Sequence, residues 1–223
     1  MTKNSIALFV FLGALAGAGA EPVRYAVRFK DVVIATQEVT IVQADDLITT
    51  TSAFAADLRV FVANHHYGEA LSVTYRPDGT VVAFSARRTD GPVQVEITGA
   101  AGAEDVLRVV RTDREGISTN FIPRADYDFH SLILYGTEPS QFLPSNKVAR
   151  VLNIAEGRIV PTTMQTISES QTTSERQYVR ATHLIWGEGP YLSHSWHPER
   201  FSNLPTRYIR QSDTGEFIFD LQR

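Results

Sequence analysis

The sequence predicts an all-β fold, an antiparallel barrel-like or clam-like sheet of about eleven or twelve strands with one short helix. Segment after segment alternates apolar and polar residues, which is the period of a half-buried strand. Turn signals rich in Asp, Gly and Pro separate these segments. No Gly/Ser/Pro-rich linker divides the 223 residues. Since all-β domains commonly reach this length, residues 21–223 are expected to form a single antiparallel domain.

The first twenty residues have the features of a secretory signal peptide. Lys3 precedes an apolar run from Ile6 to Leu15, and Ala18-Gly19-Ala20 offers small residues at a cleavage position. This run is shorter than the roughly 20 apolar residues that a membrane-spanning helix needs, and the chain has no cysteine for lipid attachment. We predict cleavage after Ala20 and a soluble periplasmic or secreted product that has no membrane span and is not a lipoprotein.

Three strands are expected at the start of the mature chain. Residues 23–30 alternate, with Val23, Tyr25, Val27 and Phe29 on one face. A second strand is expected over residues 32–43 and a third over 47–54. The next segment, 54–65, stays open, because its apolar spacing fits both a helix and a strand.

Hairpins dominate the remainder of the pattern. Pro77-Asp78-Gly79 and Asp90-Gly91 separate three β-rich runs, and Asp-Gly between alternating apolar residues is a strong hairpin signal. Further strands are expected over residues 105–112, 116–122, 148–155, 158–168, 175–186, 191–196, 206–211 and 216–221.

One short helix is expected over residues 126–136. Asp126 or Asp128 can cap its first turn, Leu132 and Tyr135 follow at helical spacing, and Gly136 can end it. This helix could plug or gate one end of the barrel.

The inward-facing apolar residues offer one candidate ligand site. A lining of this kind could hold an apolar molecule such as a lipid tail, or it could simply be the core that every β domain of this size needs. Both interpretations remain open. The candidate ligand-binding residues are Tyr25, Val27, Phe29, Tyr75, Phe84 and Leu132.

The histidines are weak candidates for a metal site. His194 and His197 are three residues apart in a strand-like segment, so their side chains should point to opposite faces. Adjacent His65 and His66 should also point apart. One histidine of each pair could still meet one from the other, but no recognised ligand spacing is present. We predict no metal and no other cofactor.

Other chemistries find little support. The net charge of −4 becomes −5 once Lys3 is removed, which disfavours nucleic-acid binding. The absence of cysteine excludes thiol catalysis and thiolate metal sites. No Gly-x-Ser-x-Gly elbow exists. Asp128, His130 and Ser131 have the residue types of a catalytic triad, but they are nearly contiguous, and capping or turn packing explains them better.

The chain closes with Trp196, then Pro198-Glu199, then Leu204-Pro205-x-Arg207 and a final alternating strand. This ending resembles that of the domain-of-unknown-function 3108 family, and it is similar to that of the related family 6134. Both contain exported bacterial β-rich proteins. The opening R-Y-x-V-x-F strand at residues 24–29 agrees, whereas His197 departs from the aliphatic residue usual there. The resemblance implies a periplasmic barrel-like domain and carries over no catalytic residue. The signature residues are Trp196, Leu204, Pro205, Arg207, Asp128 and Ser131.

Three functions follow as hypotheses. The first is a non-enzymatic periplasmic carrier of an apolar envelope molecule or lipid. The second is a structural or assembly factor with a packed interior whose surface binds another envelope protein. The third, least favoured, is a metal-dependent hydrolase that would use His65 or His66 with His194 or His197.

Overall fold

A computed structural model describes residues 21–60, 63–135, 147–172, 178–188, 191–198, 204–212 and 215–222. The expected signal peptide, residues 1–20, lies outside the described residues. The described strands all belong to a single sheet of fifteen strands. Neighbouring strands are antiparallel, except that β9 and β10 are parallel. The predicted all-β antiparallel fold is confirmed, with more strands than expected.

The sheet has two leaves. The first leaf contains β1 (Val23–Phe29), β2 (Val32–Ala44), β3 (Leu47–Val60), β4 (Ala63–Tyr75), β5 (Val81–Asp90), β6 (Val93–Ala101), β7 (Val106–Asp113) and β8 (Gly116–Pro123). The second contains β9 (Phe129–His130), β10 (Lys147–Asn153), β11 (Arg158–Thr172), β12 (Tyr178–Glu188), β13 (Tyr191–Pro198), β14 (Arg207–Ser212) and β15 (Gly215–Gln222).

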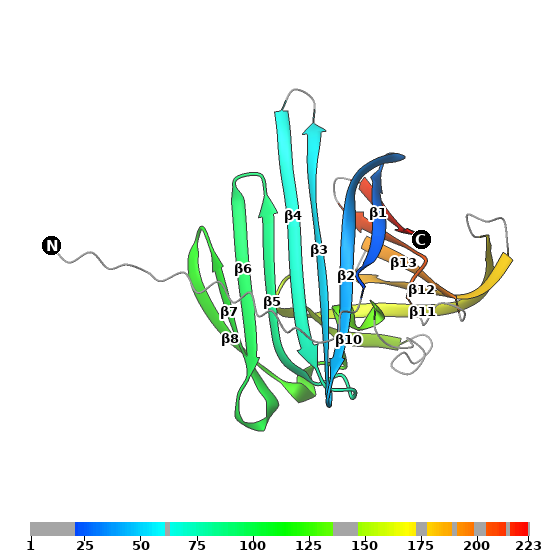
Figure 1. Cartoon of the computed structure of the whole chain (residues 1–223). Helices are drawn as coiled ribbons and strands as arrows, with labels where there is room; N and C mark the ends of the chain where they lie inside the picture. Colours follow the sequence, from blue (N-terminus) through cyan, green and yellow to red (C-terminus); the bar gives the residue numbers. More distant parts are fainter. Residues whose placement is uncertain are drawn as a thin grey trace.

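The two leaves join where the ends of the chain meet. β1 pairs with β2 on one side and with β15 on the other, so the first and last strands are neighbours. In Figure 1, β2 to β6 stand nearly upright, whereas β10 to β13 run across behind them. The strand order begins with β8 and ends with β9. The sheet is therefore folded over like a clam, with β8 and β9 as its two outermost strands.

The described part of the ambiguous segment, residues 54–60 and 63–65, belongs to a long hairpin. β3 and β4 pair from Ile48 opposite Tyr75 to Val60 opposite Ala63. Phe54 and Ala56 are buried, whereas Ala55 is exposed, which is the alternation of a strand. Continuous cross-strand hydrogen bonding therefore decides against the helical spacing that the same residues also show.

The prediction of a single helix over residues 126–136 is wrong for residues 126–135, the part that the structure describes. The chain there forms a 3₁₀ turn, η2 (Arg124–Asp126), then β9, then a second 3₁₀ turn, η3 (Ser131–Tyr135). Asp128 does not cap a helix. Its backbone N–H donates to the Arg150 carbonyl (2.8 Å), and its carboxylate accepts from the Arg150 N–H (2.7 Å). Pairing with β10 thus replaces a helix too short to be stable alone.

The segment between β8 and β10 fills the space between the leaves. Its buried side chains are Tyr127, Phe129, Leu132 and Ile133. They belong to a core cluster that also contains buried residues of the first leaf, such as Leu71 and Ile122, and of the second leaf, such as Ala149 and Leu184. Packing is close, because a Cβ atom placed on Gly99 would lie 2.0 Å from the Phe84 ring. A second, smaller cluster lies near β1 and contains Tyr25, Val27, Val39, Tyr208 and Phe219.

Candidate functional site

Five of the six candidate ligand-binding residues lie in two separate core clusters. Tyr25 and Val27 belong to the cluster near β1, whereas Tyr75, Phe84 and Leu132 belong to the larger cluster. Phe29 is only partly buried and packs against Phe217, with ring centroids 5.0 Å apart.

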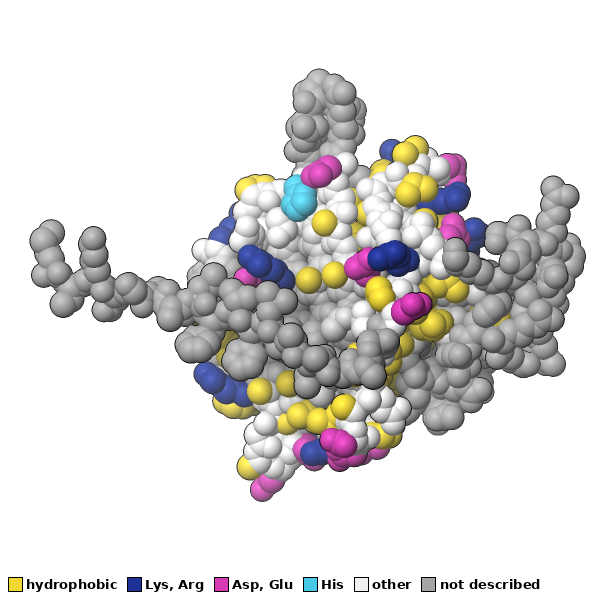
Figure 2. Space-filling model, viewed as in Figure 1, with side chains coloured by type: hydrophobic (Ala, Val, Ile, Leu, Met, Phe, Trp, Pro, Cys, Tyr) yellow, Lys and Arg dark blue, Asp and Glu magenta, His cyan; other side chains and the backbone are white. Residues whose placement is uncertain are grey.

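The larger described hollow lies on the outer surface of the first leaf. It has a volume of about 370 Å³ and is open to solvent. Four neighbouring strands line it, and each contributes one small polar residue, namely Thr51, Ser72, Ser85 and Thr98. This leaf faces the viewer in Figure 2, where charged side chains form scattered groups and no single patch. The hollow is shallow, and its lining is mostly apolar, with Ala53, Ala70, Leu71, Ala86 and Ile97 among its residues.

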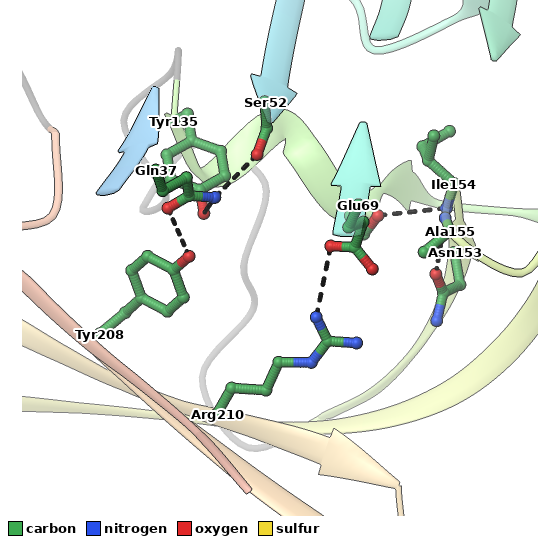
Figure 3. A network of polar contacts seen from close by, with 10 residues as sticks. Gln37, Ser52, Glu69, Tyr135, Asn153, Ile154, Ala155, Tyr208 and Arg210 are labelled. Atoms are coloured by element: carbon green, nitrogen blue, oxygen red, sulfur yellow. Dashed lines mark hydrogen bonds and ion pairs between the residues drawn. The ribbon is translucent and has the colours of Figure 1, made fainter. Parts of the chain in front are cut away.

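The interior holds a polar cluster centred on Gln37 of β2 (Figure 3). Its amide Nε2 donates to Ser52 Oγ at 2.7 Å, and its Oε1 accepts from the Tyr208 hydroxyl at 2.6 Å. The same Nε2 lies 3.5 Å from the Tyr135 hydroxyl. Since Ser52 lies on β3, Tyr208 on β14 and Tyr135 on η3, this one amide links both leaves to the segment between them.

Three tyrosine rings surround this amide. Tyr25, Tyr135 and Tyr208 pack edge-on against one another, with ring centroids 5.9 to 6.2 Å apart. Burial raises the pKa of all three hydroxyls. They therefore stay protonated and can donate hydrogen bonds, but they cannot act as bases near neutral pH.

A carboxylate and a guanidinium face each other beside the tyrosines. Glu69 of β4 is 7% exposed, and its Oε1 lies 3.4 Å from Nη1 of Arg210 on β14. The negative charge of Glu69 raises the pKa of Arg210. Two buried atoms of this region, Glu69 Oε2 and the Tyr25 hydroxyl, have no hydrogen-bond partner among the described residues. The polar cluster could therefore accept further hydrogen bonds.

The three triad-like residues serve separate structural roles. The Asp128 carboxylate pairs with the Arg150 guanidinium at 2.9 Å. Ser131 Oγ accepts from the backbone N–H of Ile154 at 3.2 Å. His130 is fully buried against the Tyr75 ring, with centroids 4.3 Å apart. No pair of the three is hydrogen-bonded to each other in the described contacts, so the arrangement is not a nucleophile with its base.

The other signature residues stabilise the second leaf. Arg207 donates to the Asp220 carboxylate across β14 and β15 at 2.6 Å. Pro205 is buried just before β14, at a position where no ladder donor is required. Leu204 is partly buried beside it. The ring of Trp196 stacks on that of His183.

The histidine candidates lie apart. His197 points to the inner face, where its Nε2 lies 2.9 Å from Ser195 Oγ. His194 points to the outer face, where its Nδ1 lies 3.0 Å from Nε2 of His183. His66 pairs with Asp57 on the β3–β4 hairpin at 2.8 Å. The side chain of His65 lies outside the described residues. Across the described part of the chain, no group of three or more His, Cys, Asp or Glu could hold a metal.

His183 is the residue that sequence reasoning missed. It has no motif around it, and it lies eleven residues from His194. Only the pairing of β12 with β13 brings them together. An alignment of the expected strands over residues 175–186 and 191–196 as a hairpin would have been the one sequence signal for it.

The outermost strand β8 exposes large apolar side chains. Ile117 is 75% exposed and Phe121 is 63% exposed, whereas Ile122 is buried on the other face. Among the described pairings, β8 contacts β7 on one side and no strand on the other. The backbone N–H of Phe121 donates to the side chain of its neighbour Asn120 at 2.9 Å. That N–H therefore points away from β7.

Comparison with known proteins yields one structural likeness. No family model matches the chain, and no curated protein matches it. A solved β-barrel-like protein of domain of unknown function DUF1849, from Brucella abortus, superposes with a TM-score of 0.60 at 9% identity. The match covers 91% of this chain and 95% of that one. This chain has a β-barrel-like fold.

The likeness at this identity concerns the fold. The fold is β-rich and is shared with a domain of unknown function, as the sequence led us to expect, whereas membership of family 3108 or 6134 stays a prediction. No helix in the described part of the chain is long and apolar enough to cross a membrane.

Proposed function

We propose that this protein is a periplasmic, non-enzymatic assembly factor that captures an extended segment of another envelope protein on strand β8. Export rests on the signal-peptide pattern of residues 1–20. The observation that carries the proposal is the outermost strand β8 with solvent-exposed Ile117 and Phe121. We further propose that the chain is a member of the 3108 or 6134 family, on its signature residues.

The backbone of β8 supports strand addition. Because the Phe121 N–H points away from β7, the alternating ladder predicts that the N–H groups of Thr119 and Ile117 do the same. Their side chains also share one face with Phe121. An added strand would gain main-chain hydrogen bonds from this edge and specificity from alternate side chains.

The chemistry of β8 also indicates which segment would fit. Its sequence, GISTNFIP, carries no charge. Aromatic and β-branched residues pair well across strands, so the partner segment should place apolar residues opposite Ile117 and Phe121. Arg108 of β7 lies beside Phe121 in the register. An acidic residue flanking the apolar ones would complement it.

A packed interior favours this function over transport. The candidate lining residues other than Phe29 are buried by their own packing. Closely packed protein interiors leave little room for a lipid tail without rearrangement. The surface is then the part of the molecule left to bind a partner.

Site-specific photocrosslinking in the periplasm tests the proposal. A photoreactive residue at Phe121 is expected to give one discrete adduct, and the same residue at Val32, which is 62% exposed on β2, is expected to give none. Thr119→Pro, which removes an outward N–H, should abolish the adduct. Asn120→Ala, which frees the Phe121 N–H, should increase it.

The outcomes separate the alternatives. Equal labelling from Phe121 and Val32, or no effect of Thr119→Pro in a variant that keeps its urea midpoint, would contradict strand addition. An adduct with the mass of two copies of this chain would show self-association, and would reject capture of a different envelope protein.

A second candidate function is the binding of an amphipathic or apolar molecule. The Tyr25 hydroxyl and Glu69 Oε2 inside the clam favour it, because neither has a hydrogen-bond partner among the described residues and buried polar atoms normally have partners. Native mass spectrometry of detergent-free mature protein checks it. A retained mass of several hundred daltons, lost in Glu69→Gln, is expected for this function, whereas a clean apo mass rejects it.

A further inference from the structure

We infer that His183 and His194 form a binding site for a divalent transition-metal ion, Cu²⁺ in preference to Ni²⁺ or Zn²⁺, on the outer face of the β12–β13 hairpin. The inference is independent of the strand-capture function, because β8 lies at the far end of the strand order. It rests on the relative positions of two imidazole rings and one indole ring.

The strand register brings the two histidines onto one face. His183 lies opposite Trp196, and Ile185 lies opposite His194. His183 and His194 are therefore diagonal neighbours across the hairpin, within reach of long side chains. Their ring centroids are 5.2 Å apart, with an angle of 29° between the ring planes. His197 points to the other face and takes no part.

The separation of the facing nitrogens suits two ligands of one ion. His183 Nε2 and His194 Nδ1 are 3.0 Å apart. With metal–nitrogen bonds of about 2.0–2.1 Å, this separation subtends an angle of about 95° at a shared ion. That angle is close to the 90° of square-planar or octahedral sites and well below a tetrahedral angle. The geometry therefore favours Cu²⁺ or Ni²⁺ over Zn²⁺, and Cu²⁺ binds such ligands more tightly than Ni²⁺.

The protons can rearrange to admit an ion. In the metal-free pair, one facing nitrogen donates its hydrogen to the other, so one lone pair is blocked. In the metal-bound pair, each ring carries its hydrogen on the nitrogen that faces away. The neutral pair therefore changes tautomer without losing a proton, and water molecules complete the coordination.

One ring is fixed and the other has access to solvent. His183 is 8% exposed, and its ring is stacked on that of Trp196 at 4.4 Å and 12°. His194 is partly exposed, so its ring can turn to aim Nδ1 at an incoming ion. A fixed first ligand lowers the entropic cost of binding. The stacked indole also provides a reporter, because bound Cu²⁺ would quench the fluorescence of Trp196.

Fluorescence titration of the mature protein tests the site. The chain has two tryptophans, Trp186 and Trp196, so Trp186→Phe leaves Trp196 as the sole indole. In that background, CuCl₂ should quench saturably at one ion per chain, with weaker binding of Ni²⁺ and weaker still of Zn²⁺. His183→Gln and His194→Gln should each weaken Cu²⁺ binding by at least about tenfold, since loss of an outer-shell partner alone costs that much. His66→Gln, an exposed histidine elsewhere, should leave it unchanged.

A spectroscopic measurement on the unsubstituted protein tests the same two ligands without relying on variants, which could misfold. The electron paramagnetic resonance spectrum of the one-to-one Cu²⁺ complex should show coupling to two imidazole nitrogens. Coupling to one nitrogen or none would overturn the site. Quenching that does not saturate, or that is equal in folded His183→Gln and His194→Gln, would overturn it as well.

Discussion

Arg210→Met is expected to lower the free energy of unfolding by about 2–3 kcal/mol near neutral pH, because it leaves the Glu69 carboxylate buried without its counter-charge. Removing one partner of a fully buried pair costs about 3–5 kcal/mol. The expected value is smaller here because the Arg210 side chain is 42% exposed and the contact is 3.4 Å long. Urea unfolding of the purified mature protein, followed by far-UV circular dichroism, measures the change.

A double-mutant cycle isolates the pair. Glu69→Gln in the Arg210→Met background should recover most of the loss, because an amide is far cheaper to bury than an unpaired carboxylate. The matched control is Arg207→Met, a change on the same strand as Arg210. It removes a more exposed pair with Asp220 of β15 and should cost within about 1 kcal/mol. Equal costs for Arg210→Met and Arg207→Met would contradict a buried, charged Glu69.

The behaviour of Glu69→Gln alone bears on function. Glu69 Oε2 lacks a partner among the described residues, so the carboxylate is held inside the clam at a cost. If the single substitution stabilises the protein, the acid is retained for something other than stability. That result would favour the ligand-binding candidate and would direct attention to the polar cluster around Gln37.

Acidification is expected to destabilise the protein by about 2 kcal/mol at pH 5 relative to pH 8 through His130 alone. Burial, with a smaller contribution from the positive charge of Arg124, lowers the pKa of His130 to about 3. In the unfolded chain the pKa is near 6.5. Between these values only the unfolded state binds the proton, so stability is retained above pH 6.5 and is lost as the pH falls toward 3.

Replacement of His130 removes this dependence. Neither ring nitrogen of His130 has a hydrogen-bond partner among the described residues, so His130→Leu should also relieve the cost of burying an unsatisfied imidazole. Urea midpoints at pH 5, 6, 7 and 8 compare the variant with the parent and with His66→Gln. A pH slope that persists in His130→Leu would show that other groups control acid unfolding.

Part of this fold is encoded locally and was predictable. The burial of Tyr25 and Val27 on one face of β1 follows from their spacing, and the turn at Gly79 follows from Pro-Asp-Gly. The opposite orientations of His194 and His197 follow from the strand period as well. None of these inferences needs knowledge of a distant partner.

Other features depended on partners far along the chain. Residues 54–65 carry a pattern that fits two structures, and only the pairing of β3 with β4 selects one. Asp128 has the sequence position of a helix cap, but its carboxylate instead accepts hydrogen bonds from Arg150, 22 residues away. Local capping preferences are worth about 1 kcal/mol, which tertiary hydrogen bonds and core packing can override.

The sequence by itself determined that this is an antiparallel all-β protein, since alternation and turn chemistry are properties of neighbouring residues. The tertiary structure alone decided that Gln37 meets Tyr208, 171 residues away, and that Glu69 meets Arg210, 141 residues away. It also placed His183 beside His194 and left β8 at the outer end of the sheet. These contacts depend on strand order, register and the folding of one leaf over the other, which no short-range pattern specifies.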